Sequence, residues 1–356
     1  VLSMHLIPDR YEPSGHSMSG GMGGVVVCRD KILERPVAIK FIRSTTHKRR
    51  MDDEVAALLK LRSKHVVQVY DVLRAAPDEI GIVQEFIDGK DLFESHQIPT
   101  SVTDYYKQLW QIASGIADIH ELGVIHRDIK PNNMKTDQEG VIKIFDFGLA
   151  RDDGPSAKTK GFVGTQGFAA PELYARPFAF TNAVDTYAFG ATALYLATGG
   201  LPNEMLEQPP SSSPAGYFGT LPLKIAPEIV KLLNACLHGE PADRPSMLEI
   251  RDALARHILF DKHRALVVYQ GHASVLAAEN RGVNLAFGEI GKISIRYDGL
   301  AFVVASVSGE VNINNQALAD GSALPGACVV ALGASHRRAN ERRFITFDIS
   351  HPEIVL

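Results

Sequence analysis

The sequence predicts an α+β fold in two lobes, a β-rich one followed by a helical one, with a small all-β sandwich after them. Short alternating strands occupy residues 25–42 and 82–87, whereas residues 105–122 repeat apolar side chains at helical spacing. From residue 267 onward the chain returns to short β-branched segments separated by glycine or asparagine turns. With 356 residues, the chain is long enough for two or three compact units.

The composition is that of an ordinary globular protein, with 45% hydrophobic and 22% charged residues. A formal net charge of −4 gives no reason to expect a nucleic acid or membrane partner, and no apolar run reaches the roughly eighteen residues of a membrane span. Cys28, Cys236 and Cys328 are too far apart for a disulfide framework or a zinc site. We therefore expect a protein of the reducing cytoplasm.

The first lobe begins with a glycine-rich segment, residues 19–25, placed just before a strand. Glycines let backbone amides approach phosphate groups closely, although a flexible turn has the same composition. The residues of this segment that we expect to contact a nucleotide are the glycines Gly20, Gly21 and Gly23.

The next strand, residues 37–42, alternates and carries a single lysine, Lys40, among apolar residues. Such a lysine is either an ordinary edge-strand residue or a ligand of phosphate. The glycine-rich segment before it and the small Ala38 two positions earlier favour the second interpretation.

Residues 126–172 contain the side chains that phosphoryl transfer needs. Asp146 and Asn133 supply the carboxylate and amide oxygens that Mg²⁺ prefers. Asp128 can accept the proton of a substrate hydroxyl, and the ammonium of Lys130 can neutralise charge on the transferred group.

The order of these segments is similar to that of a eukaryotic-type (Hanks-type) Ser/Thr protein kinase of the bacterial kind. The stretches that carry the resemblance are His126-Arg127-Asp128-Ile129-Lys130-Pro131-Asn132-Asn133, Asp146-Phe147-Gly148, Gly164-Thr165 and Ala170-Pro171-Glu172. The resemblance covers residues 10–258 and implies a β-rich lobe, 10–85, and a helical lobe, 89–258. A lysine at position 130 is typical of the Ser/Thr kinases.

The resemblance also implies where ATP binds. It makes Lys40 the phosphate lysine and Glu54 its ion-pair partner, with Asp53 as the alternative, and it places the adenine among residues that include two departures from the family, Gln84 and Lys135. A third departure is Met18, which stands where the family has its first glycine. The residues that the resemblance places around the adenine are Val25, Ala38, Gln84, Glu85, Ile87 and Lys135.

In the segment between Asp146 and Glu172, the resemblance implies autophosphorylation of Ser156 or Thr159, because Arg127 could pair with a phosphate there. Thr165 would contact the substrate and Asp128 instead of receiving phosphate. Two further residues have structural roles in the family: Asp185 braces the catalytic loop, and Arg244 pairs with Glu172.

The β domain, residues 267–356, is predicted to contain strands at 267–269, 293–297, 300–307, 311–313, 328–332 and 344–347. Residues 311–316 and 327–333 resemble the later strands of a forkhead-associated domain. That resemblance implies a phosphoprotein or an intramolecular partner, but the arginine and serine that contact phosphothreonine in that family have no clear counterparts here. Binding of another partner protein and autoinhibition are the alternatives.

The sequence therefore predicts a Ser/Thr protein kinase that uses ATP with Mg²⁺ or Mn²⁺, acts on protein substrates and phosphorylates its own activation segment. The alternative is a pseudokinase scaffold whose β domain binds a partner. A kinase of small molecules is a weaker third option, because Lys130 and residues 164–172 resemble machinery for protein substrates.

Overall fold

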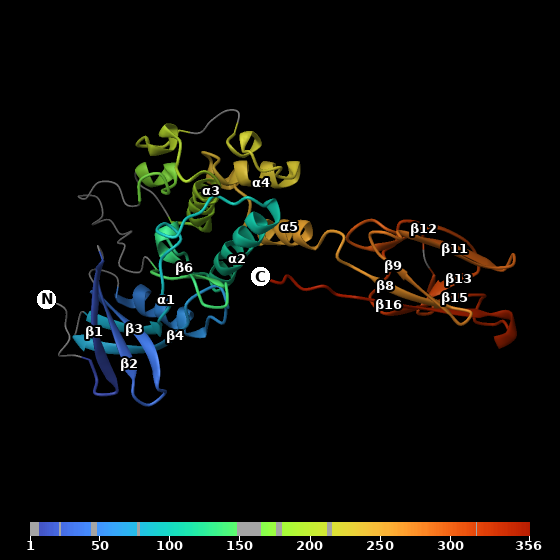
Figure 1. Cartoon of the computed structure of the whole chain (residues 1–356), viewed down its shortest axis with the longest axis horizontal. Coiled ribbons are helices and arrows are strands. Elements are labelled where there is room, and N and C mark those ends of the chain that lie inside the picture. Colours follow the sequence, from blue (N-terminus) through green and yellow to red (C-terminus); the bar gives the residue numbers. More distant parts are fainter. Residues whose placement is uncertain are drawn as a thin grey trace. The chain divides into compact units, whose positions relative to one another are not determined.

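The computed structural model describes residues 7–20, 23–43, 48–76, 79–147, 165–175, 180–211, 216–317 and 319–356 (Figure 1). The chain divides into two compact units at residues 254 and 255, with only the terminal Leu356 grouped with the first unit. We call them the N-terminal unit and the C-terminal unit. Among the helices of the described residues, none combines the length and the apolar character that crossing a membrane requires.

The first lobe of the N-terminal unit is an antiparallel five-stranded sheet with one helix. The strands follow the order β1-β2-β3-β5-β4. The elements are β1 Tyr11–Gly20, β2 Gly23–Asp30, β3 Arg35–Arg43, α1 Lys48–Lys60, β4 Val69–Ala76 and β5 Glu79–Glu85.

Strand β3 separates two cores because its side chains alternate. Val37, Ile39 and Phe41 pack on one face of the sheet with residues of β2 and β5. Lys40 and Ile42 belong to the opposite face, where Ile42 joins the core beneath α1. The alternation therefore directs Lys40 to the side of the sheet that carries α1.

The core beneath α1 also joins the two lobes. Val55 and Leu58 of α1 pack in one cluster with Ile119 and Phe147, which come from the helical part of the chain. The connection between α1 and β4 adds backbone bonds, because Ile144 N donates to His65 O at 2.9 Å and Val67 N donates to Ile144 O at 2.9 Å.

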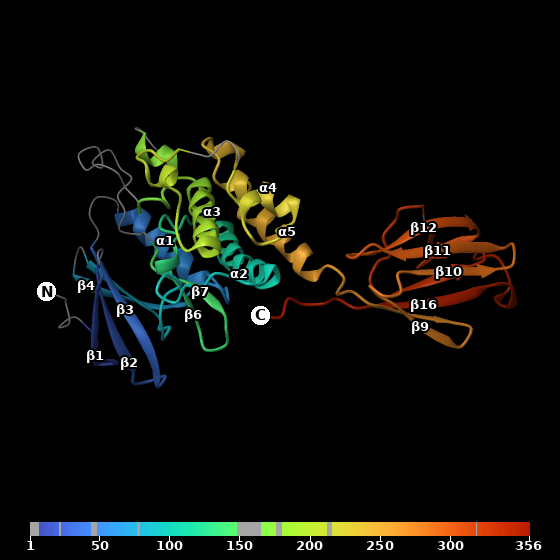
Figure 2. The same ribbon diagram turned by 45° about the horizontal axis from the view of Figure 1, so that its top comes forward.

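The second lobe consists mainly of helices, with a small two-stranded sheet (Figure 2). Its elements are α2 Val102–Glu121, β6 Met134–Thr136, β7 Ile142–Ile144, α3 Asn182–Thr198, α4 Pro227–Cys236 and α5 Met247–Leu259. Helix α2 begins at Ser101, whose side chain accepts a hydrogen bond from Asp104 N. Gly115 in α2 allows a close approach, since a Cβ there would lie 2.8 Å from His65 O and 2.9 Å from Ile144 Cδ1.

The C-terminal unit is built of two antiparallel sheets. Their strands are β8 Ala265–Tyr269, β9 His272–Leu276, β10 Gly282–Phe287, β11 Gly291–Tyr297, β12 Phe302–Gly309, β13 Val311–Ile313, β14 Gln316–Ala317, β15 Cys328–Leu332 and β16 Arg343–Ile349. One sheet has the order β10-β11-β12 and the other the order β14-β13-β15-β16-β8-β9.

Both sheets contribute to one hydrophobic core, which makes the unit a sandwich. Ile295 and Phe302 come from the smaller sheet, and Val267, Val330 and Phe347 come from the larger one. The six strands predicted from the sequence are confirmed, whereas the prediction missed β9, β10 and β14.

Candidate active site

The catalytic loop is fixed by a buried carboxylate from α3. Asp185 accepts hydrogen bonds from His126 N at 2.7 Å and from Arg127 N at 2.8 Å. His120 Nε2 lies 2.9 Å from the same carboxylate. Burial would raise the pKa of Asp185, but the bond with His120 and the neighbouring imidazoles outweigh it and lower the pKa. The prediction that Asp185 braces the catalytic loop is confirmed: its anionic carboxylate binds the backbone of His126 and Arg127.

His126 connects this loop to the segment that carries Asp146. Its Nε2 lies 3.0 Å from Phe145 O, and its Nδ1 accepts from Asp128 N at 3.3 Å. This pattern requires the proton on Nε2. Burial lowers the pKa of His126, which keeps the ring neutral. The imidazole therefore aligns two backbone segments that each carry a candidate catalytic aspartate.

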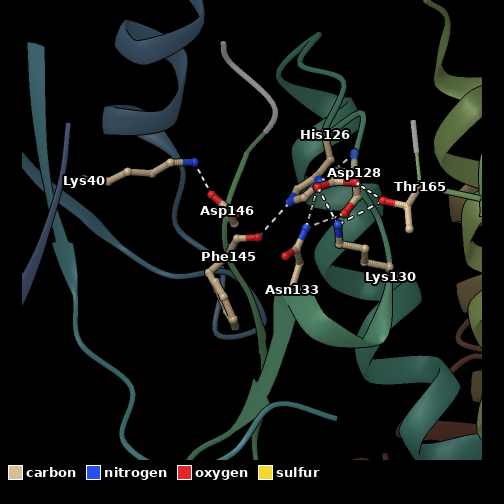
Figure 3. Close-up of polar contacts among 8 residues, drawn as sticks. All are labelled: Lys40, His126, Asp128, Lys130, Asn133, Phe145, Asp146 and Thr165. Atoms are coloured by element: carbon tan, nitrogen blue, oxygen red, sulfur yellow. Dashed lines mark hydrogen bonds and ion pairs between the residues drawn. The ribbon is translucent and has the colours of Figure 1, made fainter. Parts of the chain in front are cut away.

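Asp128 lies at the centre of a polar cluster that the sequence predicted only in part (Figure 3). Its carboxylate accepts from Asn133 Nδ2 at 3.0 Å and from Thr165 Oγ1 at 3.2 Å, and it lies 3.1 Å from Lys130 Nζ. Lys130 Nζ also donates to Thr165 Oγ1 at 3.0 Å. Three side chains up to 37 positions away in the sequence thus converge on a carboxylate whose residue is only 7% exposed.

Lys40 reaches across from β3 and forms an ion pair with Asp146. Asp146 has a left-handed backbone with φ = 66°, which is uncommon outside glycine. The Lys40 side chain is 10% exposed and that of Asp146 is 34% exposed. The structure therefore brings the predicted phosphate lysine to the predicted metal aspartate.

The donor set around Asp146 suits a hard divalent cation. Asn133 Nδ2 is engaged by Asp128 O at 2.7 Å and by the Asp128 carboxylate, so its amide oxygen is the atom turned toward the Asp146 side (Figure 3). In the described residues no group of three or more His, Cys, Asp or Glu side chains could hold a metal. Mg²⁺ fits a site of one acid and one amide because it usually keeps water and phosphate oxygens as its remaining ligands.

Glu54 and Arg127 form another ion pair between the lobes, which the sequence did not predict. The Arg127 side chain is 3% exposed and that of Glu54 is 13% exposed. The Arg127 guanidinium also lies 5.2 Å from the centre of the Phe180 ring. The sequence predicted that Glu54 pairs with Lys40, but this pair is not among the described contacts of Lys40. The Lys40 ammonium instead binds Asp146, and the Glu54 carboxylate binds Arg127.

Four of the six expected adenine-binding residues, Val25, Ala38, Gln84 and Glu85, lie along β2, β3 and β5. Val25 is the cross-strand neighbour of Lys40, and Ala38 is the neighbour of Gln84. Glu85 accepts from Lys143 Nζ, with the closest approach at 2.8 Å. These neighbours place the predicted pocket residues on adjoining strands.

Lys135 is the unusual residue of this region. Its Nζ donates to Ile87 O at 3.2 Å and lies 5.9 Å from the centre of the Phe145 ring. The ammonium of Lys135 thus binds the backbone of the segment that connects the lobes.

The glycine-rich segment is described only at its ends. Gly20 ends β1, Gly23 begins β2, and the two are paired across the hairpin. Met18 pairs with Val25 in the same hairpin. Gly21 lies outside the described residues, as do the predicted phosphorylation sites Ser156 and Thr159.

The remaining structural prediction for this lobe is confirmed. Arg244 binds Glu172 through two nitrogens at 2.7 and 2.8 Å, and its side chain is fully buried. Sequence reasoning missed His120, whose only signal is a histidine at the end of an otherwise apolar helix face. It also missed Arg127 as a partner of Glu54, because nothing in the spacing of these residues indicates it.

The β-rich lobe supplies Lys40, and the helical lobe supplies Asp128 and Asp146. Asp185 holds the loop that carries Asp128. This arrangement defines the class of phosphotransferases with two lobes. The chain belongs to the protein kinase family, since the family model described as "Protein kinase domain" matches residues 16–255. Members of this family use ATP and a divalent metal.

Several curated proteins are similar to the chain. Serine/threonine-protein kinase pkn3 of Myxococcus xanthus is 31% identical over 258 residues, which cover 65% of this chain and 46% of that protein. A probable serine/threonine-protein kinase of Corynebacterium efficiens, CE0033, is 31% identical over 264 residues, covering 67% and 40%. Human cyclin-dependent kinase-like 2 is 35% identical over 190 residues, covering 51% and 38%. The chain thus spans less than half the length of each of these relatives.

Proposed function

We propose that this chain is an active Ser/Thr protein kinase that transfers the γ-phosphoryl group of ATP to hydroxyl groups of proteins, its own activation segment included. The single observation that carries the proposal is the cluster of Asp128, Lys130, Asn133 and Thr165, with Lys40 paired to Asp146 beside it. The relatives named as serine/threonine kinases support the choice of acceptor.

In the proposed mechanism, Asp128 orients the substrate hydroxyl and accepts its proton while the oxygen forms a bond to the γ-phosphorus and the bond to the β-phosphate oxygen breaks. Lys130 neutralises charge on the transferred group. The Thr165 hydroxyl binds both Asp128 and Lys130 and so fixes their positions relative to each other. Lys40 binds phosphate oxygens of the nucleotide. Bound Mg²⁺ or Mn²⁺, held by Asp146 and Asn133, would neutralise phosphate charge.

The test is transfer of radiolabelled phosphate from ATP, with Mg²⁺ or Mn²⁺, by the full chain onto itself and onto a generic basic protein. Asp128→Asn and Lys40→Met are expected to lower transfer by roughly 10²–10⁴-fold while leaving thermal unfolding nearly unchanged. Asp252→Asn, the same chemical change at an exposed position of α5, is the matched control. Absence of both transfer and nucleotide binding in the unmodified chain would favour the scaffold alternative.

For the C-terminal unit we propose binding of a partner protein. Large apolar side chains on the outer face of its six-stranded sheet support this role: Leu266, Val268, Val275, Val329 and Phe344, each 38–54% exposed. The expected reducing compartment is supported by the cysteines, since Cys28, Cys236 and Cys328 are all buried and free.

A further inference from the structure

A cluster of large apolar side chains lies close to the catalytic residues and has no role in the mechanism above. We call Phe93, Phe168, Tyr195 and Leu206 the aromatic shelf. The Phe93 ring stacks on the Tyr195 ring, with centroids 5.3 Å apart and an angle of 14° between the planes, and Phe168 lies 6.3 Å from the same ring. Phe93 remains 47% exposed and Leu206 remains 38% exposed. Exposed apolar side chains that adjoin one another in this way are typical of a binding surface.

The shelf is continuous with the catalytic cluster through the backbone. Phe168 N and Ala169 N both donate to Thr165 O at 3.0 Å, while the Thr165 hydroxyl donates to Asp128. Gly167, with φ = 84°, lies between them, and a Cβ there would lie 2.7 Å from Leu201 Cδ1 and 3.0 Å from Leu206 Cδ2. The turn that orients Thr165 toward Asp128 therefore also carries one edge of the shelf.

The shelf is also held rigidly, as a binding surface requires. Asp91 Oδ1 accepts from Phe93 N at 2.9 Å and from Glu94 N at 2.8 Å, which fixes the turn that presents Phe93. His96 Nε2 lies 3.1 Å from Leu196 O and its ring lies 5.1 Å from that of Tyr195, so the turn is attached to the end of α3. The apolar surface exists before any ligand arrives.

The charges near the shelf indicate which segments it accepts. Within three positions of Phe93 or Leu206 the sequence carries the carboxylates of Asp91, Glu94, Glu204 and Glu207 and one ammonium, that of Lys90. An acidic segment would be repelled from this surface, whereas a neutral or basic segment with a large apolar side chain would complement it.

We propose that the aromatic shelf binds a large apolar side chain, Leu, Met or Phe, of the protein substrate at a fixed position near the phosphorylated residue, and so selects the substrate. This inference rests on the proposed kinase function and adds the class of substrate to it. The contact with the shelf contributes to the affinity for the substrate, and the chemistry stays with Asp128 and Lys130.

The test uses the full chain and a set of serine peptides with a neutral-to-basic background, in which leucine replaces alanine at each flanking position in turn. At one position leucine is expected to raise kcat/KM about tenfold over alanine, mainly through KM. Phe93→Ala should reduce this ratio to near one. Leu248→Ala, a 50% exposed leucine of α5, is the matched control and should keep the tenfold ratio.

A second variant guards against loss of folding. Phe93→Glu is expected to change the preference at the same position from leucine to lysine, a gain that an unfolded protein cannot produce. Peptides phosphorylated with no preference for leucine at any position, or a preference that persists in both Phe93 variants, would overturn the inference and leave the kinase function intact. No phosphorylation of any peptide or of the chain itself would overturn both.

Discussion

The helical-lobe half of the active site and the β-lobe half both present charged side chains, but they are held in different ways. In the helical lobe, Asn133 and Thr165 both bind Asp128 directly, and Asp185 fixes the loop that carries Asp128. In the β lobe, Lys40 and Glu54 each form an ion pair with a residue of the other lobe. Hydrogen bonds within the helical lobe thus hold the first half together. The second half depends on the position of α1 and β3 relative to the helical lobe.

This difference implies that substitutions in the two halves of the active site affect the reaction differently. The helical-lobe half has one arrangement, because each group is bound to several others over short distances. The β-lobe half instead depends on two ion pairs that join residues of different lobes, Lys40 with Asp146 and Glu54 with Arg127. We expect substitutions that disturb the first half to lower activity more than loss of the ion pair between Glu54 and Arg127.

Beyond the changes at Asp128 and Lys40 described above, the largest effect is expected from Asp185→Asn. The variant leaves His126 N and Arg127 N with a neutral acceptor and deprives His120 of its anionic partner, so the free energy of unfolding should fall by about 3 kcal/mol. Displacement of the loop should lower kcat about a hundredfold. Thermal unfolding and steady-state kinetics measure both. A variant with the kcat of the unmodified chain would show that Asp185 stabilises the fold without positioning Asp128.

Glu54→Gln is expected to have an intermediate effect. The change removes the negative charge from the ion pair between Glu54 and the buried Arg127 guanidinium and should cost about 2 kcal/mol of stability, with kcat/KM lowered about tenfold. Asp53→Asn is the matched control, since Asp53 is the exposed neighbour of Glu54 on α1. If the two variants behave alike in unfolding and in kinetics, the ion pair between Glu54 and Arg127 contributes to neither property.

Lys135→Met should have a smaller effect, confined to the nucleotide. Methionine keeps an apolar stem but cannot donate to Ile87 O, so apolar surface replaces the ammonium beside the expected adenine position. We expect the KM for ATP to fall about threefold with kcat unchanged. A rise in KM would indicate that the ammonium of Lys135 itself contacts the nucleotide.

The smallest effect on activity is expected from a change that acts on stability in acid alone, at the joint between the two lobes. Burial lowers the pKa of His65 from its usual 6.5 to about 4. The unfolded chain therefore binds a proton between these pH values that the folded chain does not, and stability falls as the pH decreases through this window, by at most about 3 kcal/mol. His65→Asn keeps a donor for Ile142 O but does not titrate. Its melting temperature should depend less on pH from 6.5 to 4; equal slopes for both proteins would contradict the assignment.

The two halves of the active site also differ in how well the sequence could predict them. Asp128, Lys130 and Asn133 lie within six positions, so their spacing alone nearly determines their geometry. The ion pair of Glu54 with Arg127 joins residues 73 positions apart and depends on the placement of α1. Spacing indicates which groups are available, but it does not indicate which of two oppositely charged neighbours each one meets.

The C-terminal unit shows a second limit, which concerns strands. The predicted strands are rich in Val and Ile, and all of them were found. Strands β9 and β10 have the sequences His-Ala-Ser-Val-Leu and Gly-Val-Asn-Leu-Ala-Phe, whose residues have low or mixed β-propensity. These two strands form through pairing with β8 and β11, which is tertiary information that a local pattern does not contain.

The hydrogen bond between Lys135 and Ile87 O has a consequence for inhibitor chemistry. A compound that offers a hydrogen-bond donor to this carbonyl must displace an ammonium already bound there, and this charge-assisted bond is stronger than the one a neutral compound forms. A compound with a carboxylate or another strong acceptor at that position would instead gain a bond to Lys135. Acidic ATP-competitive compounds are therefore expected to distinguish this kinase from those with an apolar residue at the corresponding position.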